Sequence, residues 1–339
     1  MAAEPGTIIV LNGAAGAGKS SIVRAYQTLA EEPHLDAGLD RFLRMLPPRF
    51  LEGNAWQDVM GQHDGPGETG RRLASVMHRA IGAIAAGGMS VLADHVVVER
   101  AWLGDMAEAF ERLPAYLVGV TCPQDVLEER ERTRGDRQAT IGEAARQAPI
   151  VHAAAAYDLE VDTSRLSAED AAQRIRAHIQ SWPPRAFRLL RLFEGAPDFC
   201  RRLVSEPSSA SWDDFLADAR TVALAMPEDE QVELLNAHPR IGAAPSSVSA
   251  LSYSEQGYDR DPATAQLQER LNRLNDSYER RFGFRFVIFV AGRSRIDIAD
   301  VMERHLDAER SEELRRGLGD VIAIARDRAQ SSEQEALSQ

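Results

Sequence analysis

The stretch TIIVLNGAAGAGKS, residues 7–20, decides the fold of the first half of the chain. It opens with a continuous apolar, β-branched run, which has the length and composition of a strand buried on both faces of a parallel sheet. Residues 13–20 then match the pattern G-x-x-x-x-G-K-[ST], and a helical pattern follows at residues 20–30. This order of strand, glycine-rich turn and helix is the context in which the motif cradles phosphate.

The glycine-rich turn predicts a ring of backbone N–H groups around an anion, and the helix that follows adds the positive end of its dipole. Lys19 is the single lysine among the 39 Lys and Arg residues. We expect its compact, mobile ammonium group to reach the β- and γ-phosphates, and Ser20 to contact Mg²⁺. The residues predicted to contact the nucleotide here are Gly13, Gly16, Ala17, Gly18, Lys19, Ser20 and Ser21.

Strand-like and helical patterns alternate through the rest of the first half. The apolar runs lie at 90–93, 115–120 and 157–161, and the helical stretches at 70–86, 101–112 and from the cap Ser167 to about residue 180. This alternation predicts βαβ units. The expected fold is an α/β domain of the P-loop NTPase type, with a parallel sheet and helices on both of its faces.

Three further features of the first half have more than one interpretation. Asp94 ends an apolar run, where its carboxylate could reach a metal ion, although an N-cap or an ordinary loop acid would look the same. Asp40 could accept the proton of a hydroxyl substrate, or it could simply cap a helix. The arginine-rich run 130–137 fits a lid that closes over a phosphate, or the solvated end of a charged helix.

Five blocks of the first half, spread over residues 7–180, resemble the chloramphenicol phosphotransferase-like family of P-loop kinases. They are LNGAAGAGKSSIVR (11–24), LDRFLRMLPP (39–48), LVGVTCP (117–123), ERTRGDR (131–137) and VHAAAAYDLEVDTS (151–164). The resemblance implies MgATP as phosphoryl donor, with Ser20 and Asp94 at the metal. It implies Asp40 as the base for the acceptor hydroxyl, and Arg134 and Arg137 as phosphate ligands. Family members can carry a second acid where this chain has His95, and region 50–70 has no clear match. The resemblance therefore does not identify the molecule that accepts the phosphoryl group.

The segment SWPPR, residues 181–185, ends the first half, because two consecutive prolines stop a helix and fit a linker. We divide the chain into a kinase-like domain (1–180), a linker (181–186), a helical domain (187–329) and a polar tail (330–339). One apolar run in the helical domain, 284–290, could be a strand or a buried helix segment, which periodicity alone does not decide. Helices are expected at 186–204, 212–226, 228–237, 262–280, 296–308 and 311–329.

A second set of candidate residues lies in the helical half. His238, followed by Pro239 at a predicted helix end, could transfer protons near neutral pH, or it could cap the helix by bonding its last carbonyl groups. Ser252, Glu255 and Gln256 would share one face of a helix and could line a pocket. The same spacing is also that of a capping box, and the local sequence does not separate the two.

Four blocks of the second half, within residues 187–329, resemble the 2-oxo-4-hydroxy-4-carboxy-5-ureidoimidazoline (OHCU) decarboxylase family. They are AHPRIG (237–242), SYSEQ (252–256), LNDSYERRFGFRFVIFVAGRSR (274–295) and ELRRGLGDVIAIARDR (313–328). The resemblance implies an all-helical, cofactor-free enzyme of urate degradation that forms (S)-allantoin, with His238 and Glu255 as catalytic residues. The substrate contacts that it implies are Ser252, Gln256, Pro239, Phe284, Phe286 and Ile288.

Composition limits the classes of partner. The 339 residues carry a formal net charge of −13, split as −7 over residues 1–180 and −6 over 181–339, so neither half suits a nucleic-acid backbone. Cys122 and Cys200 are the two cysteines, which favours a reducing compartment, and no apolar run is long enough to cross a bilayer. We expect a cytoplasmic protein that acts on small molecules, with a homodimer as one option.

Taken together, these features predict a bifunctional enzyme: an ATP-dependent phosphotransferase acting on a small-molecule hydroxyl, joined to an OHCU decarboxylase. One alternative keeps the decarboxylase and makes the P-loop half a non-catalytic ATP-sensing or structural module, a hypothesis motivated by His95 and the unmatched region 50–70. Another makes the second half a helical dimerisation module, against which the SxxEQ and FGF blocks argue.

Overall fold

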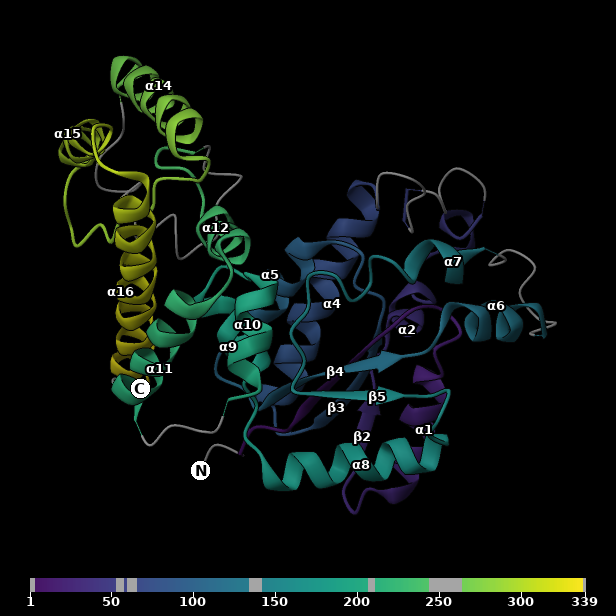
Figure 1. Cartoon of the computed structure of the whole chain (residues 1–339). Helices are drawn as coiled ribbons and strands as arrows, with labels where there is room; N and C mark the ends of the chain where they lie inside the picture. The colour runs from purple at the N-terminus through teal and green to yellow at the C-terminus, as the bar shows by residue number, and fades with distance from the viewer. Residues whose placement is uncertain are drawn as a thin grey trace. The chain divides into compact units, whose positions relative to one another are not determined.

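The computed structural model describes residues 4–52, 58–59, 66–133, 142–206, 211–243 and 264–337 (Figure 1). The chain divides into two compact units, Met1–Arg191 and Leu192–Gln339. The division falls at the end of helix α9 (Ala186–Leu192), several residues beyond the two prolines at 183 and 184.

The described part of the first unit contains a five-stranded parallel sheet in the order β2-β3-β1-β4-β5 (Figure 1). The strands are β1 (Ile8–Asn12), β2 (His34–Asp36), β3 (Ser90–His95), β4 (Ala115–Thr121) and β5 (Leu159–Asp162). The parallel sheet with flanking helices that the sequence predicts is therefore confirmed. The sequence does not predict β2, which is three residues long and has no apolar run.

Helices cover both faces of this sheet. They are α1 (Lys19–Leu29), α2 (Leu39–Leu43), α4 (Glu68–Ala86), α5 (Arg100–Ala109), α6 (Gln124–Thr133), α7 (Glu143–Gln147) and α8 (Ala168–Ser181), with a 3₁₀ turn at Pro48–Phe50. Helices α1 and α8 pack together against one face, and α4 and α5 against the other (Figure 1). Helix α8 begins at the predicted cap, where Ser167 Oγ accepts the Asp170 N–H at 3.0 Å.

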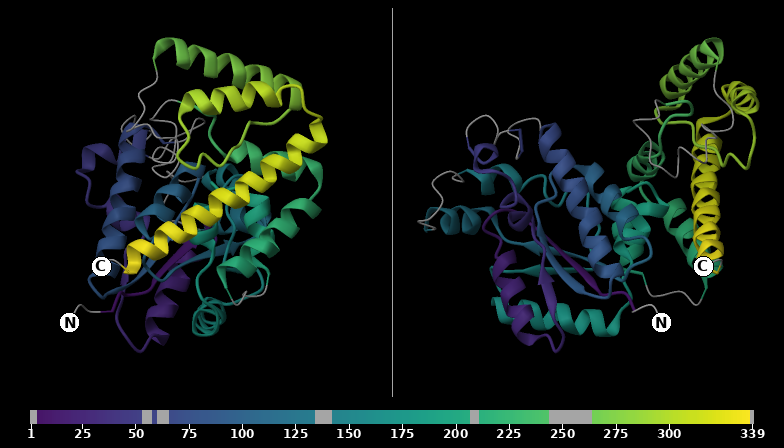
Figure 2. Two further views of the ribbon diagram at one scale, coloured as in Figure 1. Left: turned by 90° about the vertical axis from the view of Figure 1, so that its left-hand side faces the viewer. Right: turned by 180° about the vertical axis from the view of Figure 1, so that it is seen from behind.

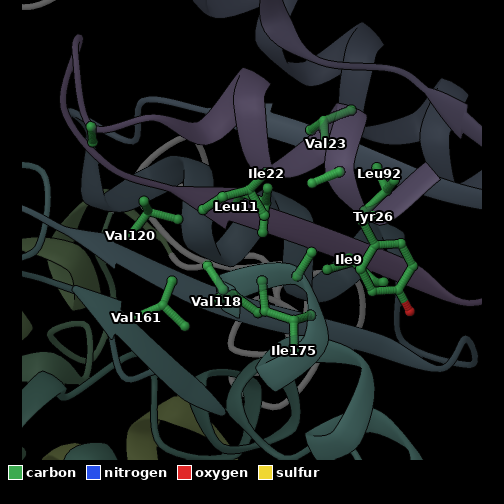
Figure 3. Close-up of a cluster of buried hydrophobic side chains, with 14 of the residues drawn as sticks. Ile9, Leu11, Ile22, Val23, Tyr26, Leu92, Val118, Val120, Val161 and Ile175 are labelled. Atoms are coloured by element: carbon green, nitrogen blue, oxygen red, sulfur yellow. The ribbon is translucent and has the colours of Figure 1, made fainter. Parts of the chain in front are cut away.

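Burial of β1 on both faces fixes the start of the glycine-rich turn. All five β1 residues are buried. Ile9 and Leu11 belong to one cluster with Ile22 of α1 and Ile175 of α8 (Figure 3), and alternation turns the neighbouring β1 side chains to the opposite face. Each fully buried aliphatic side chain contributes about 2 kcal/mol, so the strand holds its carboxyl end in one place.

The described part of the second unit is helical (Figure 2). Its helices are α10 (Pro197–Val204), α11 (Trp212–Ala225), α12 (Glu228–Ala237), α14 (Ala265–Phe282), α15 (Arg295–His305) and α16 (Arg310–Leu337). The single helix expected at 186–204 is wrong, because Glu194 and Gly195 have φ of 52° and 73° and separate α9 from α10. Helix α16 also continues past the expected end at residue 329, and α11 and α12 pack against it.

The segment 284–290 is neither of the two structures expected for it. It forms no helix, it pairs with no described strand, and most of its side chains are buried. Its backbone is bonded to side chains instead: Phe289 N donates to Asp320 Oδ1 at 3.2 Å, and Arg316 Nη1 donates to the Val287 carbonyl at 2.9 Å. Because side chains of α16 satisfy the backbone, the segment needs no neighbouring strand.

Asp158 joins the start of α9 to the sheet. Its Oδ1 accepts the N–H groups of Arg185 (2.7 Å) and Ala186 (3.0 Å), and its Oδ2 accepts that of Leu117 in β4 (2.8 Å). Burial raises the pKa of this carboxyl group, against the lowering effect of these backbone donors. The two residues after the prolines are thus hydrogen-bonded within the first unit.

We predict that Asp158→Ala accelerates amide hydrogen exchange at Leu117, Arg185 and Ala186, because three N–H groups lose their acceptor and each lost bond costs about 1 kcal/mol. Exchange followed by NMR or mass spectrometry tests this. Glu160→Ala, in the neighbouring strand β5 and exposed, is the control and should leave these amides unchanged. Equal exchange in the two variants would contradict the assignment.

Candidate active sites

Three glycines shape the turn that follows β1. Gly16 and Gly18 have φ of 83° and 87°, a region that residues with a side chain rarely adopt. Gly13 meets a different constraint, because a Cβ atom there would lie 2.4 Å from the carbonyl oxygen of Val120. Gly18 is also the N-cap of α1, so the helix begins directly after the turn. The glycines therefore allow the tight, inward-turned backbone that a phosphate cradle requires.

Lys19 lies folded against this turn. Its Nζ donates to the carbonyl oxygens of Gly13 (2.6 Å) and Ala14 (2.8 Å), and the residue is 9% exposed. A phosphate would compete for the ammonium group with neutral carbonyl oxygens, and a charged acceptor makes the stronger hydrogen bond. The lysine can therefore exchange these contacts for a phosphate without leaving the turn.

Ser20 and Asp94 meet at the carboxyl ends of two adjacent strands. Ser20 Oγ donates to Asp94 Oδ2 at 2.7 Å, since Ser20 opens α1 and Asp94 pairs in register with Leu11 of β1. Carboxylate and hydroxyl oxygens are ligands that suit Mg²⁺. The pair fits the metal ion that accompanies a nucleoside triphosphate, whose phosphates would supply further ligands.

Gly38 brings Asp40 close to the same carboxylate. A Cβ atom on Gly38 would lie 1.7 Å from Asp94 Oδ1, so glycine is what lets the backbone pass at this point. Gly38 is the N-cap of α2, and Asp40 lies exposed in the first turn of that helix. The hydrogen bond to Asp36, together with the charges of Asp94 and Asp40, raises the pKa of Arg41. Asp36, Asp40 and Asp94 thus act together on Arg41 near the carboxyl ends of β2 and β3.

His95 faces away from these acids, because alternation along β3 puts its side chain opposite to that of Asp94. His95 Nε2 lies 3.0 Å from His78 Nε2, and His78 Nδ1 lies 2.5 Å from Asp105 Oδ2. Burial and the neighbouring His78 lower the pKa of His95 well below its usual range. The imidazole therefore belongs to a buried polar chain that reaches α4 and α5, not to the cradle.

Side chains from outside the motif support the turn. Gln147 Oε1 accepts a backbone N–H of the turn, that of Ala15, at 2.8 Å. Arg130 donates to the Gly16 carbonyl (3.3 Å) and to both the hydroxyl (3.0 Å) and the carbonyl (2.7 Å) of Thr163. Arg130 thereby connects the turn to the end of β5. Arg134 and Arg137, the predicted phosphate ligands, lie outside the described residues.

The second unit contains a pocket of about 820 Å³, open solvent included. His238, the C-cap of α12, lines it and is 4% exposed. The other residues around it are Pro239, Ile241, the segment 286–292, and Ile324, Asp327 and Arg328 of α16. Most of the lining side chains are apolar, and the charged ones come from α16.

Arg328 brings a buried positive charge to this pocket. The residue is 3% exposed, and its guanidinium donates to Glu194 Oε1 at 2.6 Å and to the Leu192 carbonyl at 3.2 Å. Glu194 is the residue with the left-handed backbone between α9 and α10. The helix break thus places a carboxylate that compensates the buried guanidinium.

A buried polar network fixes the pocket wall. Glu313 accepts from Tyr278 Oη at 2.6 Å and from Arg316 Nε at 3.0 Å, and it contacts His305 Nδ1 at 2.6 Å. Burial acts to raise the pKa of Glu313, but the hydrogen bonds from Arg316 and Tyr278 prevail and lower it. Since Arg316 also binds the Val287 carbonyl, this network positions the segment that lines the pocket.

The predicted residues of the second site fall into three groups. His238, Pro239, Phe286 and Ile288 all line the pocket. Phe284 is 1% exposed and packs against Tyr278 and Phe282 in the aromatic core, and it is not among the described residues that line the pocket. Ser252, Glu255 and Gln256 lie outside the described residues.

Comparison with known proteins matches each unit separately. The family model of chloramphenicol phosphotransferase-like proteins matches residues 6–180, and that of OHCU decarboxylase matches residues 180–330. A Mycobacterium tuberculosis protein described as a candidate O-phosphotransferase is 35% identical over 207 residues, 56% of this chain and 91% of its own length. An OHCU decarboxylase of Halalkalicoccus jeotgali is 36% identical over 138 residues, 40% of this chain and 76% of its own. A crystal structure of OHCU decarboxylase in the presence of (S)-allantoin aligns with 42% of this chain and 94% of its own, at 20% identity and a TM-score of 0.36.

The chain belongs to both families. A kinase-like domain is followed by an OHCU decarboxylase domain, and both family resemblances noted in the sequence are confirmed. The kinase-like domain implies use of a nucleotide, typically with Mg²⁺. Within the described ranges, no helix is long and apolar enough to cross a membrane, and no group of three or more His, Cys, Asp or Glu could hold a metal ion.

Sequence reasoning missed the residues that support the two sites from a distance. Gln147 lies in a five-residue helix that shows no periodicity. Arg130 belongs to the arginine-rich run, but nothing local separates a residue that binds the turn from a solvated one. Arg328 lies in a predicted helix. Its burial would single it out as a site residue, but the charged residues around it in the sequence make it look like part of a solvent-exposed face.

We predict that Arg130→Ala weakens MgATP binding about tenfold, because the turn loses its bond from Arg130 and, through the bonds of Arg130 to Thr163, its connection to the end of β5, together worth about 1.4 kcal/mol. Titration with a fluorescent ATP analogue measures this. Arg132→Ala, on the same helix and exposed, is the matched control. Equal dissociation constants for the two variants would show that Arg130 does not support the turn.

In the decarboxylase domain, we predict that Arg316→Leu lowers the free energy of unfolding by about 3–5 kcal/mol, because the buried Glu313 carboxylate loses its guanidinium partner and keeps only Tyr278 and His305. Chemical denaturation followed by near-ultraviolet circular dichroism measures this. The neighbouring exposed residue provides the control, Arg315→Leu. A network without structural importance would make the two variants equally stable.

Proposed function

We propose that the kinase-like domain transfers the γ-phosphoryl group of MgATP to a hydroxyl group of a small molecule. The observation that carries this proposal is the convergence of Lys19, the Ser20–Asp94 pair and Asp40 at one end of the sheet. The acceptor oxygen forms a bond to the γ-phosphorus while the bond from that phosphorus to the bridging oxygen breaks. The proton passes to Asp40, and ADP leaves.

Each residue has a part suited to its surroundings. The backbone N–H groups of the turn and the Lys19 ammonium would hold the phosphates, and they would stabilise the charge that develops during transfer. Ser20 and Asp94 would hold Mg²⁺, directly or through its water molecules. Arg134 and Arg137 are proposed as further phosphate ligands, on the strength of the family resemblance.

For the second domain, we propose decarboxylation of OHCU to (S)-allantoin without a metal ion or organic cofactor. The observation that carries it is a nearly fully buried histidine in the wall of a largely apolar pocket that also holds a buried arginine. Loss of CO₂ moves the electron pair of the broken bond into a double bond between the two ring carbons, while the ring nitrogen of the former C=N bond takes up a proton. His238 would deliver a proton to the ureido-bearing carbon as the neighbouring hydroxyl gives up its own proton to become the carbonyl of allantoin, and Arg328 would hold the anionic substrate.

The remaining predicted residues keep their proposed parts in this reaction. Glu255 would orient the imidazole or the substrate hydroxyl, and Ser252 and Gln256 would bind the substrate. Pro239, Phe286 and Ile288 would form the apolar wall, and Phe284 would act through the packing of that wall. The cysteine usage favours the cytoplasm as the place of both reactions.

A non-catalytic P-loop module is the alternative for the first domain, motivated by His95 and the unmatched region 50–70. The His95 imidazole faces away from the phosphate cradle and contacts His78. Asp94 bonds to Ser20 of the cradle, and Asp40 follows Gly38, which passes against Asp94. The exchange of an acid for His95 therefore removes no side chain from the described phosphate site, which supports catalysis over sensing.

Two variants with crossed controls test the pair of activities. We expect Lys19→Ala to lower ATP turnover about a hundredfold or more, since it removes the charge at the developing anion, while OHCU decarboxylation is unchanged. We expect His238→Ala to lower decarboxylation about a hundredfold or more, while ATP turnover is unchanged. Formation of (S)-allantoin is followed by circular dichroism, and ADP by a coupled assay.

For each variant, a different outcome would contradict the proposal. Wild-type decarboxylation by His238→Ala would contradict the role of this residue as proton donor. Unaltered MgATP affinity and turnover in Lys19→Ala would contradict the phosphotransferase proposal, and binding of MgATP without transfer to any of a panel of hydroxylated metabolites would favour a sensor.

A further inference from the structure

Helix α12 ends at the residue proposed as the proton donor of the decarboxylase domain. His238 is its C-cap, with φ of −73° and ψ of 145°, so the chain leaves the helix there in an extended direction. The next residue is Pro239, which has no N–H group to donate to a carbonyl group of the last helical turn. Carbonyl groups at this helix end are therefore open to a donor from elsewhere in the fold.

Arg285 supplies such a donor. Its Nη1 atom carries two N–H bonds, and it donates to the Asn236 carbonyl at 2.8 Å and to the His238 carbonyl at 2.7 Å. One carbonyl belongs to the last turn of α12, and the other to the first residue beyond the helix. The guanidinium thus bridges the point at which the backbone changes direction. Its positive charge also suits the negative end of the helix dipole.

The contact between Arg285 and the helix end is reciprocal. The Asn236 side chain accepts the backbone N–H of Arg285 through Oδ1, at 2.9 Å. Arg285 lies between Phe284 and Phe286, which are each 1% exposed, so the core fixes its backbone. Each residue of the pair therefore binds the backbone of the other, and together they attach the end of α12 to segment 284–290.

The turn that follows His238 has separate supports on α14. The buried Asn275 donates to the Ile241 carbonyl at 3.0 Å. Gln268 donates to the Gly242 carbonyl at 2.7 Å. Loss of the guanidinium would therefore release the exit of α12 while the rest of the turn stays attached to α14.

Resting on the proposed role of His238 as proton donor, we infer that Arg285 is a positioning residue for decarboxylation. It fixes the backbone of His238 relative to the wall that Phe286 and Ile288 form, and so aims the imidazole at the substrate carbon. Arg285 is not among the described residues that line the pocket, so it acts through His238 and does not touch the substrate. A displacement of about 1 Å in a reacting group costs on the order of a hundredfold in rate.

The variant Arg285→Ala removes both bonds of the guanidinium, and Arg281→Ala is its matched control. The Arg281 guanidinium also donates to a carbonyl group, that of Ala308 at 3.1 Å, and neither residue is in the described lining of the pocket. Decarboxylation by the full chain is followed through the circular dichroism of (S)-allantoin. We expect Arg285→Ala to lower kcat at least about tenfold and to leave KM within about twofold. Arg281→Ala should change neither constant.

A double-mutant cycle shows whether Arg285 acts through the histidine. Once His238 is replaced by alanine, no imidazole is left for Arg285 to position. The variant that combines His238→Ala with Arg285→Ala should therefore have the kcat of His238→Ala within about twofold. A residue of general structural importance would instead lower kcat by the same factor in both backgrounds.

Two milder variants grade the contact. Asn236→Ala removes the side-chain acceptor of the Arg285 N–H, so it should lower kcat about threefold. Arg285→Lys keeps a cation that can donate to two carbonyl groups, so it should recover part of the loss seen in Arg285→Ala. Thermal unfolding shows whether each variant keeps its fold, and these two carry the test should Arg285→Ala not fold.

The outcomes separate this inference from the proposed reaction. Equal kcat values for Arg285→Ala and Arg281→Ala would overturn the positioning role, while a large loss in His238→Ala would still support the decarboxylase proposal. A raised KM with unchanged kcat, or equal effects of Arg285→Ala in the two backgrounds, would also overturn the positioning role. Wild-type decarboxylation by His238→Ala would contradict the proton donor itself, and the positioning role with it.

Discussion

Burial of β1 on both faces is the constraint on which the kinase-like domain depends. Because this strand is paired on both sides and covered on both faces, its last residue has one position, and the glycine-rich turn begins from a fixed point. Strand β1 leads on to β2 at one edge of the sheet, while its neighbour β3 leads on to β4 on the other side of β1, so these two connections leave in opposite directions and open a crevice at the carboxyl ends of the strands. Ser20 and Asp94 meet there because they follow adjacent strands, and Asp40 joins them because Gly38 can pass beside Asp94.

The decarboxylase domain positions the wall of its pocket without a sheet. Its pocket wall is a segment without regular secondary structure, whose backbone bonds to α16 through Arg316 and Asp320. Arg316 is in turn held by Glu313, whose other partners are Tyr278 and His305. In the first domain, strand pairing holds a loop in place. In the second, buried charges do so, which makes the wall dependent on a network whose members must all be satisfied.

The elements that could be predicted from the sequence are those with a long hydrophobic pattern, which is visible within the element itself. The buried runs of β1, β3 and β4 and the amphipathic α4 and α8 are of this kind. Helices α2 and α7 are five residues long and β2 three, which is too short for a period to show.

Segment 284–290 could not be predicted, because several of its backbone partners are side chains about thirty to fifty residues away in the sequence. In the sites, motifs pointed to the residues proposed to touch a ligand, such as Lys19 and His238. The residues that hold these in place, such as Arg130 and Glu313, have partners that only the fold brings together.

The bonds that Asp158 makes to Arg185 and Ala186 affect how such a chain can be recombined. The two prolines look like the natural seam between modules, yet the residues just after them satisfy a carboxylate of the first module. A cut at the prolines would deprive that carboxylate of two donors and leave the first module with a defect at its own sheet. A fusion that replaces the decarboxylase domain by another domain should therefore join the new domain after Arg191, so that the first module retains the residues that Asp158 binds.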